Sequence, residues 1–108
     1  MKDKIQILPP KVINDKLASE ALMQINQIKD NNSSVKIYRA TIGNSIHRND
    51  WIFLSRAQAE RWTRTALGTP KPGVKVIEST VQAKDVDWTG KNLEFVYKGK
   101  RQKRNSKK

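Results

Sequence analysis

Three polar residues, Arg39, Ser55 and Glu94, stand where the surrounding sequence is apolar or where an apolar segment ends. Arg39 shares one face of the predicted strand 35–41 with Ile37, and a cation on such a face either meets an anion or reaches water at the rim of the sheet. Ser55 follows the apolar run "WIFL" and opens a helical pattern, so it caps that helix or presents its hydroxyl at the junction. Glu94 lies among large apolar residues of a later strand and raises the same question as Arg39.

The rest of the composition restricts the chemistry that this chain can perform. It contains no cysteine, which excludes disulfides and thiolate metal sites. Its one histidine, His47, lies in the loop-like stretch 43–50 and has neither the partners of a catalytic triad nor the spacing of metal ligands. No glycine-rich loop precedes a Lys-Ser or Lys-Thr pair, so a Walker-type phosphate loop is absent. We therefore expect no metal cofactor.

The segments that carry the three polar residues are "IYRA", "NDWIFLSRAQAERW" and "VQAKDVDWTGKNLEFVY". Over residues 35–97 they resemble the small ADP-ribosyltransferase-like domains that are often appended to phage head-morphogenesis proteins. Those domains typically carry an Arg-Ala pair on a strand, a Gly-Asp-Trp followed by a serine at a strand-to-helix junction, and a late glutamate followed by a tyrosine. The resemblance implies an α+β fold with a small, split antiparallel β-sheet and packed helices.

The resemblance also implies a mono-ADP-ribosyltransferase that uses NAD as substrate and modifies a protein or nucleic-acid acceptor, in a phage or another mobile element. In the family pattern Arg39 would hold the dinucleotide, because a planar guanidinium binds phosphate oxygens in pairs. Ser55 would hold the ribose next to nicotinamide and orient Glu94. The Glu94 carboxylate would stabilise the oxocarbenium-like centre that forms as nicotinamide leaves.

Aromatic residues near these positions serve either as core or as a surface for nicotinamide: Tyr38, Trp51 and Trp62. The chain departs from the family pattern at Asn92, where the toxin branch has a Glu or Gln that positions the acceptor. The type of acceptor therefore stays open. The segment "FLSR" also replaces a Ser-Thr-Ser-like triplet.

Two amphipathic helices are predicted to cover the sheet. The first spans residues 14–32 with Asn14 as its N-cap, and its apolar stripe consists of Leu17 or Ala18, then Ala21, Leu22, Ile25 and Ile28. The second runs through residues 56–68, from the cap Ser55 to a stop at Gly68. Its predicted inner stripe consists of Ala59, Trp62 and Ala66, while Arg56, Glu60, Arg61 and Arg64 face outward.

Apolar runs and alternation predict four strands, 35–41, 51–54, 74–83 and 93–99. We expect the short strand 51–54 to be buried along its whole length. In the last strand Leu93, Phe95 and Tyr97 share one face. The remaining stretches have the composition of turns and irregular connections, namely 43–50, 69–73 and 84–92.

Positive charge gathers at the C-terminus. The net charge is +12, and the last eleven residues hold seven Lys or Arg and no acid, which leaves +5 on residues 1–97. We predict one domain over 1–97 and a disordered basic tail over 98–108. The tail either binds nucleic-acid phosphates or only keeps the protein in solution. The candidate nucleic-acid-binding residues are Lys98, Lys100, Arg101, Lys103, Arg104, Lys107 and Lys108.

Three functions compete on this basis. The first is NAD-dependent ADP-ribosyl transfer, and the second is a non-enzymatic nucleic-acid-binding module that keeps the same scaffold. The third is an inhibitory protein that binds another enzyme, for which no residue argues specifically. The sequence lacks an apolar run of about 18 residues and a secretory signal, so we expect no membrane contact. A cytoplasmic site of action fits the absence of cysteine.

Overall fold

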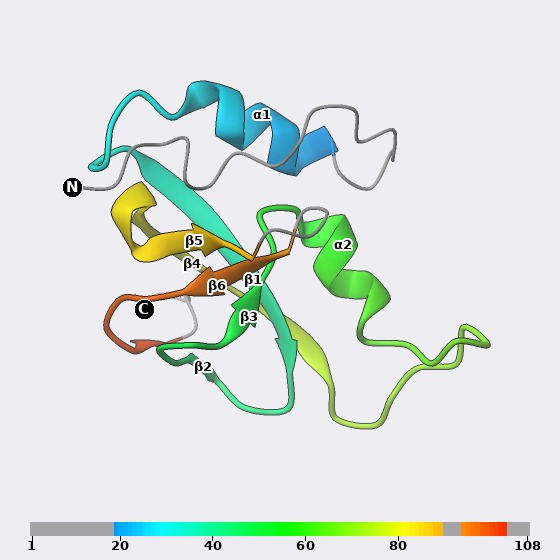
Figure 1. The fold of residues 1–108 in the computed structure, drawn as a ribbon. Helices are drawn as coiled ribbons and strands as arrows, with labels where there is room; N and C mark the ends of the chain where they lie inside the picture. The colour runs from blue at the N-terminus through cyan, green and yellow to red at the C-terminus, as the bar shows by residue number, and fades with distance from the viewer. Residues whose placement is uncertain (1–18, 90–93, 104–108) are drawn as a thin grey trace.

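The computed structural model describes residues 19–89 and 94–103 (Figure 1). These residues form a small α+β domain with antiparallel sheets, as the sequence predicts. Two helices, α1 (Ser19–Gln27) and α2 (Arg56–Arg61), flank the strands. The strands are β1 (Ser34–Thr41), β2 (Ser45–Ile46), β3 (Trp51–Ile52), β4 (Lys75–Gln82), β5 (Val86–Trp88), β6 (Phe95–Tyr97) and β7 (Gln102–Lys103), with the 3₁₀ helix η3 (Ala83–Asp85) between β4 and β5.

Within the described residues the strands form three antiparallel sheets. β1 and β4 pair over eight residues, from Ser34 opposite Gln82 to Thr41 opposite Lys75. The second sheet has the order β3-β6-β5, and the third joins β2 to β7. Tyr38 and Phe53 connect the first two sheets through two backbone hydrogen bonds of 2.8 Å each. The chain after β1 therefore returns to the middle of that strand before it enters α2.

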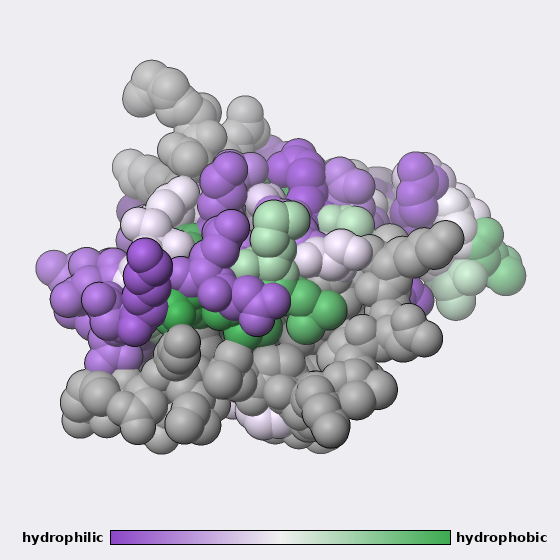
Figure 2. Space-filling model, turned by 90° about the horizontal axis from the view of Figure 1, so that it is seen from above, coloured by the Kyte–Doolittle hydropathy of each residue, from purple (hydrophilic) through white to green (hydrophobic). Residues whose placement is uncertain are grey.

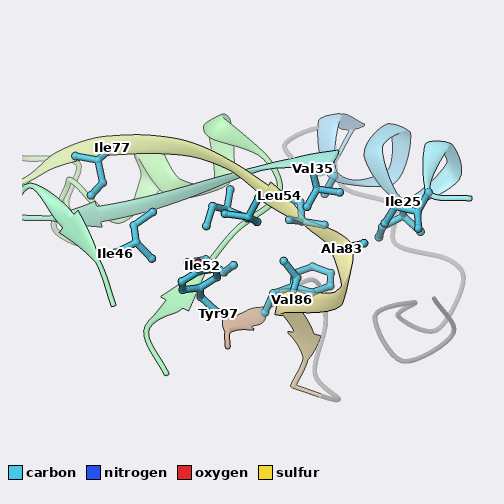
Figure 3. Packing of buried hydrophobic residues seen from close by; sticks show 14 residues of the cluster. Ile25, Val35, Ile46, Ile52, Leu54, Ile77, Ala83, Val86 and Tyr97 are labelled. Atoms are coloured by element: carbon cyan, nitrogen blue, oxygen red, sulfur yellow. The ribbon is translucent and has the colours of Figure 1, made fainter. Parts of the chain in front are cut away.

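The core lies between the β1–β4 pair and the β3-β6-β5 sheet, with α1 closing one end (Figure 3). Alternation along the strands supplies it, because every second residue points to the same face. Its fully enclosed members come from six strands, β1 to β6, from α1 and from the segment after β3. They include Ile37, Ile52, Leu54, Ile77 and Phe95, each at most 1% exposed.

Helix α1 docks through both its apolar stripe and two polar side chains. Four members of the predicted stripe are confirmed: Ala21, Ile25 and Ile28 are buried and Leu22 is half-buried. The predicted end near residue 32 is wrong, because α1 ends at Gln27, and Leu17 and Ala18 lie outside the described residues. The Gln24 amide donates to the carbonyls of Lys36 and Leu54 at 2.8 Å each and accepts from the Lys36 N–H at 2.7 Å. The Gln24 side chain thus forms hydrogen bonds with the backbone N–H and C=O of Lys36 at the edge of β1. The predicted N-cap, Asn14, lies outside the described residues.

Glu20 of α1 links two other elements. Its carboxylate accepts from the Tyr38 hydroxyl of β1 and, at 2.8 Å, from the Arg56 N–H at the start of α2. An acid at that point satisfies one of the backbone donors left open at a helix N-terminus. Burial, and then the hydrogen bond to Glu20, raises the pKa of the Tyr38 hydroxyl well above its ordinary range.

The predicted second helix is wrong in length, because α2 ends at Arg61 rather than near Gly68. The Thr63 hydroxyl donates to the Glu60 carbonyl at 2.7 Å, and the Thr65 hydroxyl accepts from the Thr69 N–H at 3.2 Å. Such local hydroxyl bonds compete with helix propagation. The chain instead forms a projecting loop. Of the predicted inner stripe only Ala59 is buried, whereas Ala66 is exposed and Trp62 is 56% exposed; the four residues predicted to face outward are exposed.

Other strand predictions hold in part. β1 and β4 confirm the strands predicted over 35–41 and 74–83. The expectation that 51–54 is buried throughout is wrong, because Trp51 is 53% exposed while Ile52 is enclosed, as alternation requires. The stretches 43–50 and 84–92 contain β2 and β5, which are too short to show a period of their own. Asn92 and Leu93 lie outside the described residues.

The prediction of disorder is wrong for residues 98–103, which fold against the domain. Gln102 of β7 accepts a 2.9 Å hydrogen bond from the buried Ser79 hydroxyl of β4, and the Tyr97 hydroxyl donates to the Lys100 carbonyl. The segment thus gives the buried Ser79 hydroxyl a hydrogen-bond partner that the apolar core does not supply. Burial raises the pKa of Tyr97, against a smaller lowering by its hydrogen bond with Gln102. Arg104, Lys107 and Lys108 lie outside the described residues.

Candidate functional site

A pocket of about 560 Å³ opens beside the ends of β1, β3 and β6 and below the C-terminal end of α2. Its volume lies within the range of roughly 300–1,000 Å³ that is typical of small-molecule sites. The lining residues come from five separate segments of the chain. They are Arg39, Ala40, Thr41, Ile42, Trp51, Phe53, Trp62, Lys71, Val74 and Glu94.

Arg39 is held at the pocket wall by two contacts. Its Nη1 donates to the Trp51 carbonyl at 2.9 Å, and its Nε lies 3.4 Å from Asp50 Oδ2. The Asp50 carboxylate also accepts the His47 backbone N–H at 2.8 Å, so the carboxylate is itself fixed. The anion expected near Arg39 is therefore Asp50. These contacts use Nε and Nη1, and the Nη2 group carries two further donors.

Glu94 lines the same pocket from a segment far away in the sequence. It directly precedes β6, where it lies on the face opposite Phe95, and its carbonyl accepts the Thr89 N–H at 3.1 Å. The side chain is half-buried. Sequence alternation placed Glu94 and Arg39 on strand faces separately, and the pairing of β3 with β6 and the bridge from β1 to Phe53 bring the two faces to one cavity.

Aromatic rings form the largest apolar part of the pocket. Phe53 and Trp62 stack with ring centroids 6.4 Å apart and an interplanar angle of 20°, and Lys71 Nζ lies 5.8 Å from the centre of the Trp62 ring. Trp51 and Trp62 are 53% and 56% exposed. Large aromatic surface beside a cavity is stabilised when a ligand covers it.

The predicted site residues do not all meet. Arg39, Glu94 and Trp51 line the pocket, whereas Ser55 does not. Ser55 is 1% exposed and caps α2, with its hydroxyl oxygen accepting the Gln58 N–H at 3.4 Å. Tyr38 is also buried outside the pocket and uses its hydroxyl on Glu20. The structure thus shows Ser55 in the capping role that its sequence position also allowed.

Six lining residues were not assigned to a site from the sequence: Ala40, Thr41, Ile42, Phe53, Lys71 and Val74. Phe53 was predicted as core, although alternation along β3 places it with Trp51 and opposite Ile52 and Leu54. Thr41 and Ile42 continue β1 beyond Arg39 and carry no chemical signal of their own. Lys71 reaches the pocket only because the loop after α2 turns back, with the Lys71 N–H donating to the Thr63 carbonyl at 2.8 Å. Nothing in the local pattern predicts that turn.

Comparison of the chain with protein-family models, with curated proteins and with solved structures finds no match. In residues 19–89 and 94–103 no cluster of three or more His, Asp or Glu side chains is arranged to hold a metal ion. Over the same residues no helix has the length and apolar character needed to cross a membrane. The function proposed below therefore depends on the residues of the pocket and on the resemblance of the three motifs.

Proposed function

We propose that the domain is ADP-ribosyltransferase-like, binds NAD in the pocket shared by Arg39 and Glu94, and transfers ADP-ribose from it to a macromolecular acceptor. The observation that carries the proposal is that these two residues, chosen from separate motifs, line one cavity of suitable size. A cation, a carboxylate and exposed aromatic rings are the groups that a pyrophosphate, a ribose and two flat bases would use.

Binding would rest on charge and ring contacts. The Nη2 donors of Arg39 supply charge-assisted hydrogen bonds to phosphate oxygens, and Lys71 adds a second cation at the rim. The face of Trp62 or Trp51 stacks on the nicotinamide or adenine ring. Because Asp50 and the Trp51 carbonyl already hold the guanidinium, little side-chain freedom is lost when the phosphate binds.

The chemical step breaks the bond between the ribose anomeric carbon and the nicotinamide nitrogen, and the bonding electron pair leaves with nicotinamide. The anomeric carbon becomes oxocarbenium-like, and the Glu94 carboxylate stabilises that positive charge through the neighbouring ribose hydroxyl. The acceptor nucleophile then forms the new bond to the anomeric carbon and gives up its proton. Ser55 has no part in this scheme, since its hydroxyl lies outside the pocket.

Calorimetric titration of the 108-residue protein with NAD tests the binding half of the proposal. Arg39→Gln removes a charge-assisted contact worth about 1.5–3 kcal/mol, so the Kd should rise about 10- to 150-fold. Arg61→Gln removes an exposed cation of α2 that does not line the pocket and serves as the matched control. Absence of NAD binding at millimolar concentration, or equal effects of the two variants, would overturn the proposal.

A further inference from the structure

A second hollow, wider than the first, lies on the part of the domain where the β6–β7 connection folds back. Its volume is about 760 Å³, and no residue lines both hollows. Three segments form it: the turn after β2, the end of β4 with η3, and the chain from β6 to β7. The lining residues are His47, Arg48, Gln82, Lys84, Asp85, Tyr97, Lys98, Gly99, Lys100, Arg101 and Gln102.

The lining is strongly basic. It contains five cations, Arg48, Lys84, Lys98, Lys100 and Arg101, against the single carboxylate of Asp85. Arg48, Lys84, Lys100 and Arg101 are exposed, so their charges face solvent. Figure 2 shows hydrophilic residues gathered at the end of the molecule that carries the α1–β1 connection in Figure 1. Only three of these five cations belong to the segment that sequence composition marked as a basic tail.

The backbone that presents these cations is fixed by hydrogen bonds. The Lys98 N–H donates to the Asp85 carbonyl at 2.7 Å, and Lys98 Nζ donates to Asn49 Oδ1 at 3.0 Å. The Tyr97 hydroxyl donates to the Lys100 carbonyl, and Gln102 is held by Ser79. Cations from distant segments are therefore placed around one concave surface in advance, which lowers the entropy cost of engaging a polyanion.

We propose that this basic hollow binds the phosphate backbone of a double-stranded nucleic acid. Tyr97 is the only Phe, Trp or Tyr among its lining residues, and it is 1% exposed and offers no face for a base to stack on. The one exposed ring in the lining is the imidazole of His47, whose Nδ1 lies 3.6 Å from Asp50 Oδ2. Proteins that hold single strands combine basic grooves with several exposed aromatic platforms, and no Phe, Trp or Tyr ring is exposed in the lining of this hollow. Contacts between these cations and phosphates would fix the position of the nucleic acid and would not distinguish base sequences. This surface is independent of the NAD pocket and of the function proposed for it.

Binding of a short labelled duplex, followed by fluorescence anisotropy over a series of salt concentrations, tests this proposal. If all five cations meet phosphates, the slope of log affinity against log salt concentration should be about −4 to −5 from this surface, at about −0.9 per phosphate. The triple variant Arg48→Gln, Lys84→Gln, Arg101→Gln should bind at least tenfold more weakly at physiological salt, and its slope should shrink by about 3.

The matched control is the triple variant Lys36→Gln, Arg61→Gln, Lys75→Gln, which removes the same charge from exposed positions that do not line the hollow. Both variants keep Arg104, Lys107 and Lys108, so any contribution of these residues is common to the two. The control should retain the parental slope and affinity within about twofold. Equal losses in both variants, absence of duplex binding at low salt, tighter binding of a single strand, or equally tight binding of polyglutamate would each overturn the proposal.

Discussion

Replacing Trp62 with alanine removes one aromatic wall of the pocket in which we propose that NAD binds. A tryptophan side chain offers about 150–250 Å² of surface, and Trp62 is 56% exposed, so about 85–140 Å² is open to a ligand. If a base covers about half of this area, its burial contributes about 1–2 kcal/mol at about 25 cal/mol per Å². The Kd for NAD should therefore rise about 5- to 20-fold.

Isothermal titration calorimetry measures this change without relying on tryptophan fluorescence, and thermal unfolding confirms that the variant is folded at the titration temperature. Trp88→Ala is the control, because Trp88 packs against the core and does not line the pocket. It should lower the melting temperature and leave the Kd within about twofold. A Trp62→Ala protein with unchanged affinity, or a Trp88→Ala protein with the larger loss of affinity, would refute the assignment of Trp62 to the binding surface.

Three further predictions concern the packing, the helix cap and the tyrosine ionisation of the domain around the pocket and the basic hollow. Gly99→Ala places a Cβ 2.5 Å from Tyr97 Oη and should lower the free energy of unfolding, measured by urea titration, by about 1–3 kcal/mol. In the control Gly43→Ala the nearest atom to the new Cβ is 3.9 Å away, so the free energy of unfolding should change little, and equal effects of the two variants would contradict the close packing at Gly99. Ser55→Ala removes a helix cap, so it should lower the free energy of unfolding by about 0.5–2 kcal/mol and leave the Kd for NAD unchanged. A large loss of NAD affinity would instead show that Ser55 belongs to the binding site. Above the ordinary tyrosine pKa of about 10, Tyr38 and Tyr97 lose their protons in the unfolded chain but keep them in the folded state, so the free energy of unfolding should fall as pH rises. Tyr38→Phe should make this fall with pH less steep, and an equally steep fall in the variant would count against the raised pKa of Tyr38.

Much of the fold was predictable where local pattern and tertiary structure agree. Alternation identified the two strands that became β1 and β4, and helical spacing identified the buried stripe of α1. Prediction failed where distant or hydroxyl-mediated bonds decide the outcome. The hydroxyls of Thr63 and Thr65 end α2 early. β7 forms because it pairs with β2 and because Gln102 bonds to Ser79, and both partners lie far earlier in the chain, where a local pattern cannot reveal them.

The candidate site was predictable to the extent that an unusual residue type marks it. A cation and an acid on apolar strands drew attention to Arg39 and Glu94, and both line the pocket. Asp50 was not identified as the partner of Arg39, because a carboxylate in a loop is ordinary in composition. Lys71 and the orientation of Trp62 depend on how the loop after α2 turns, which follows from backbone bonds and not from any periodic pattern.

The most direct measurement of the central claim is the release of nicotinamide from NAD by the purified protein, followed by chromatography in the presence of protein and nucleic-acid acceptors. Glu94→Gln keeps the shape of the side chain and removes the charge, so it should abolish release while leaving the NAD Kd within a few fold. Glu60→Gln, an exposed acid of α2 outside the pocket, should behave as the parent. Release that continues unchanged in Glu94→Gln, or no release by the parent protein with any acceptor, would contradict the account.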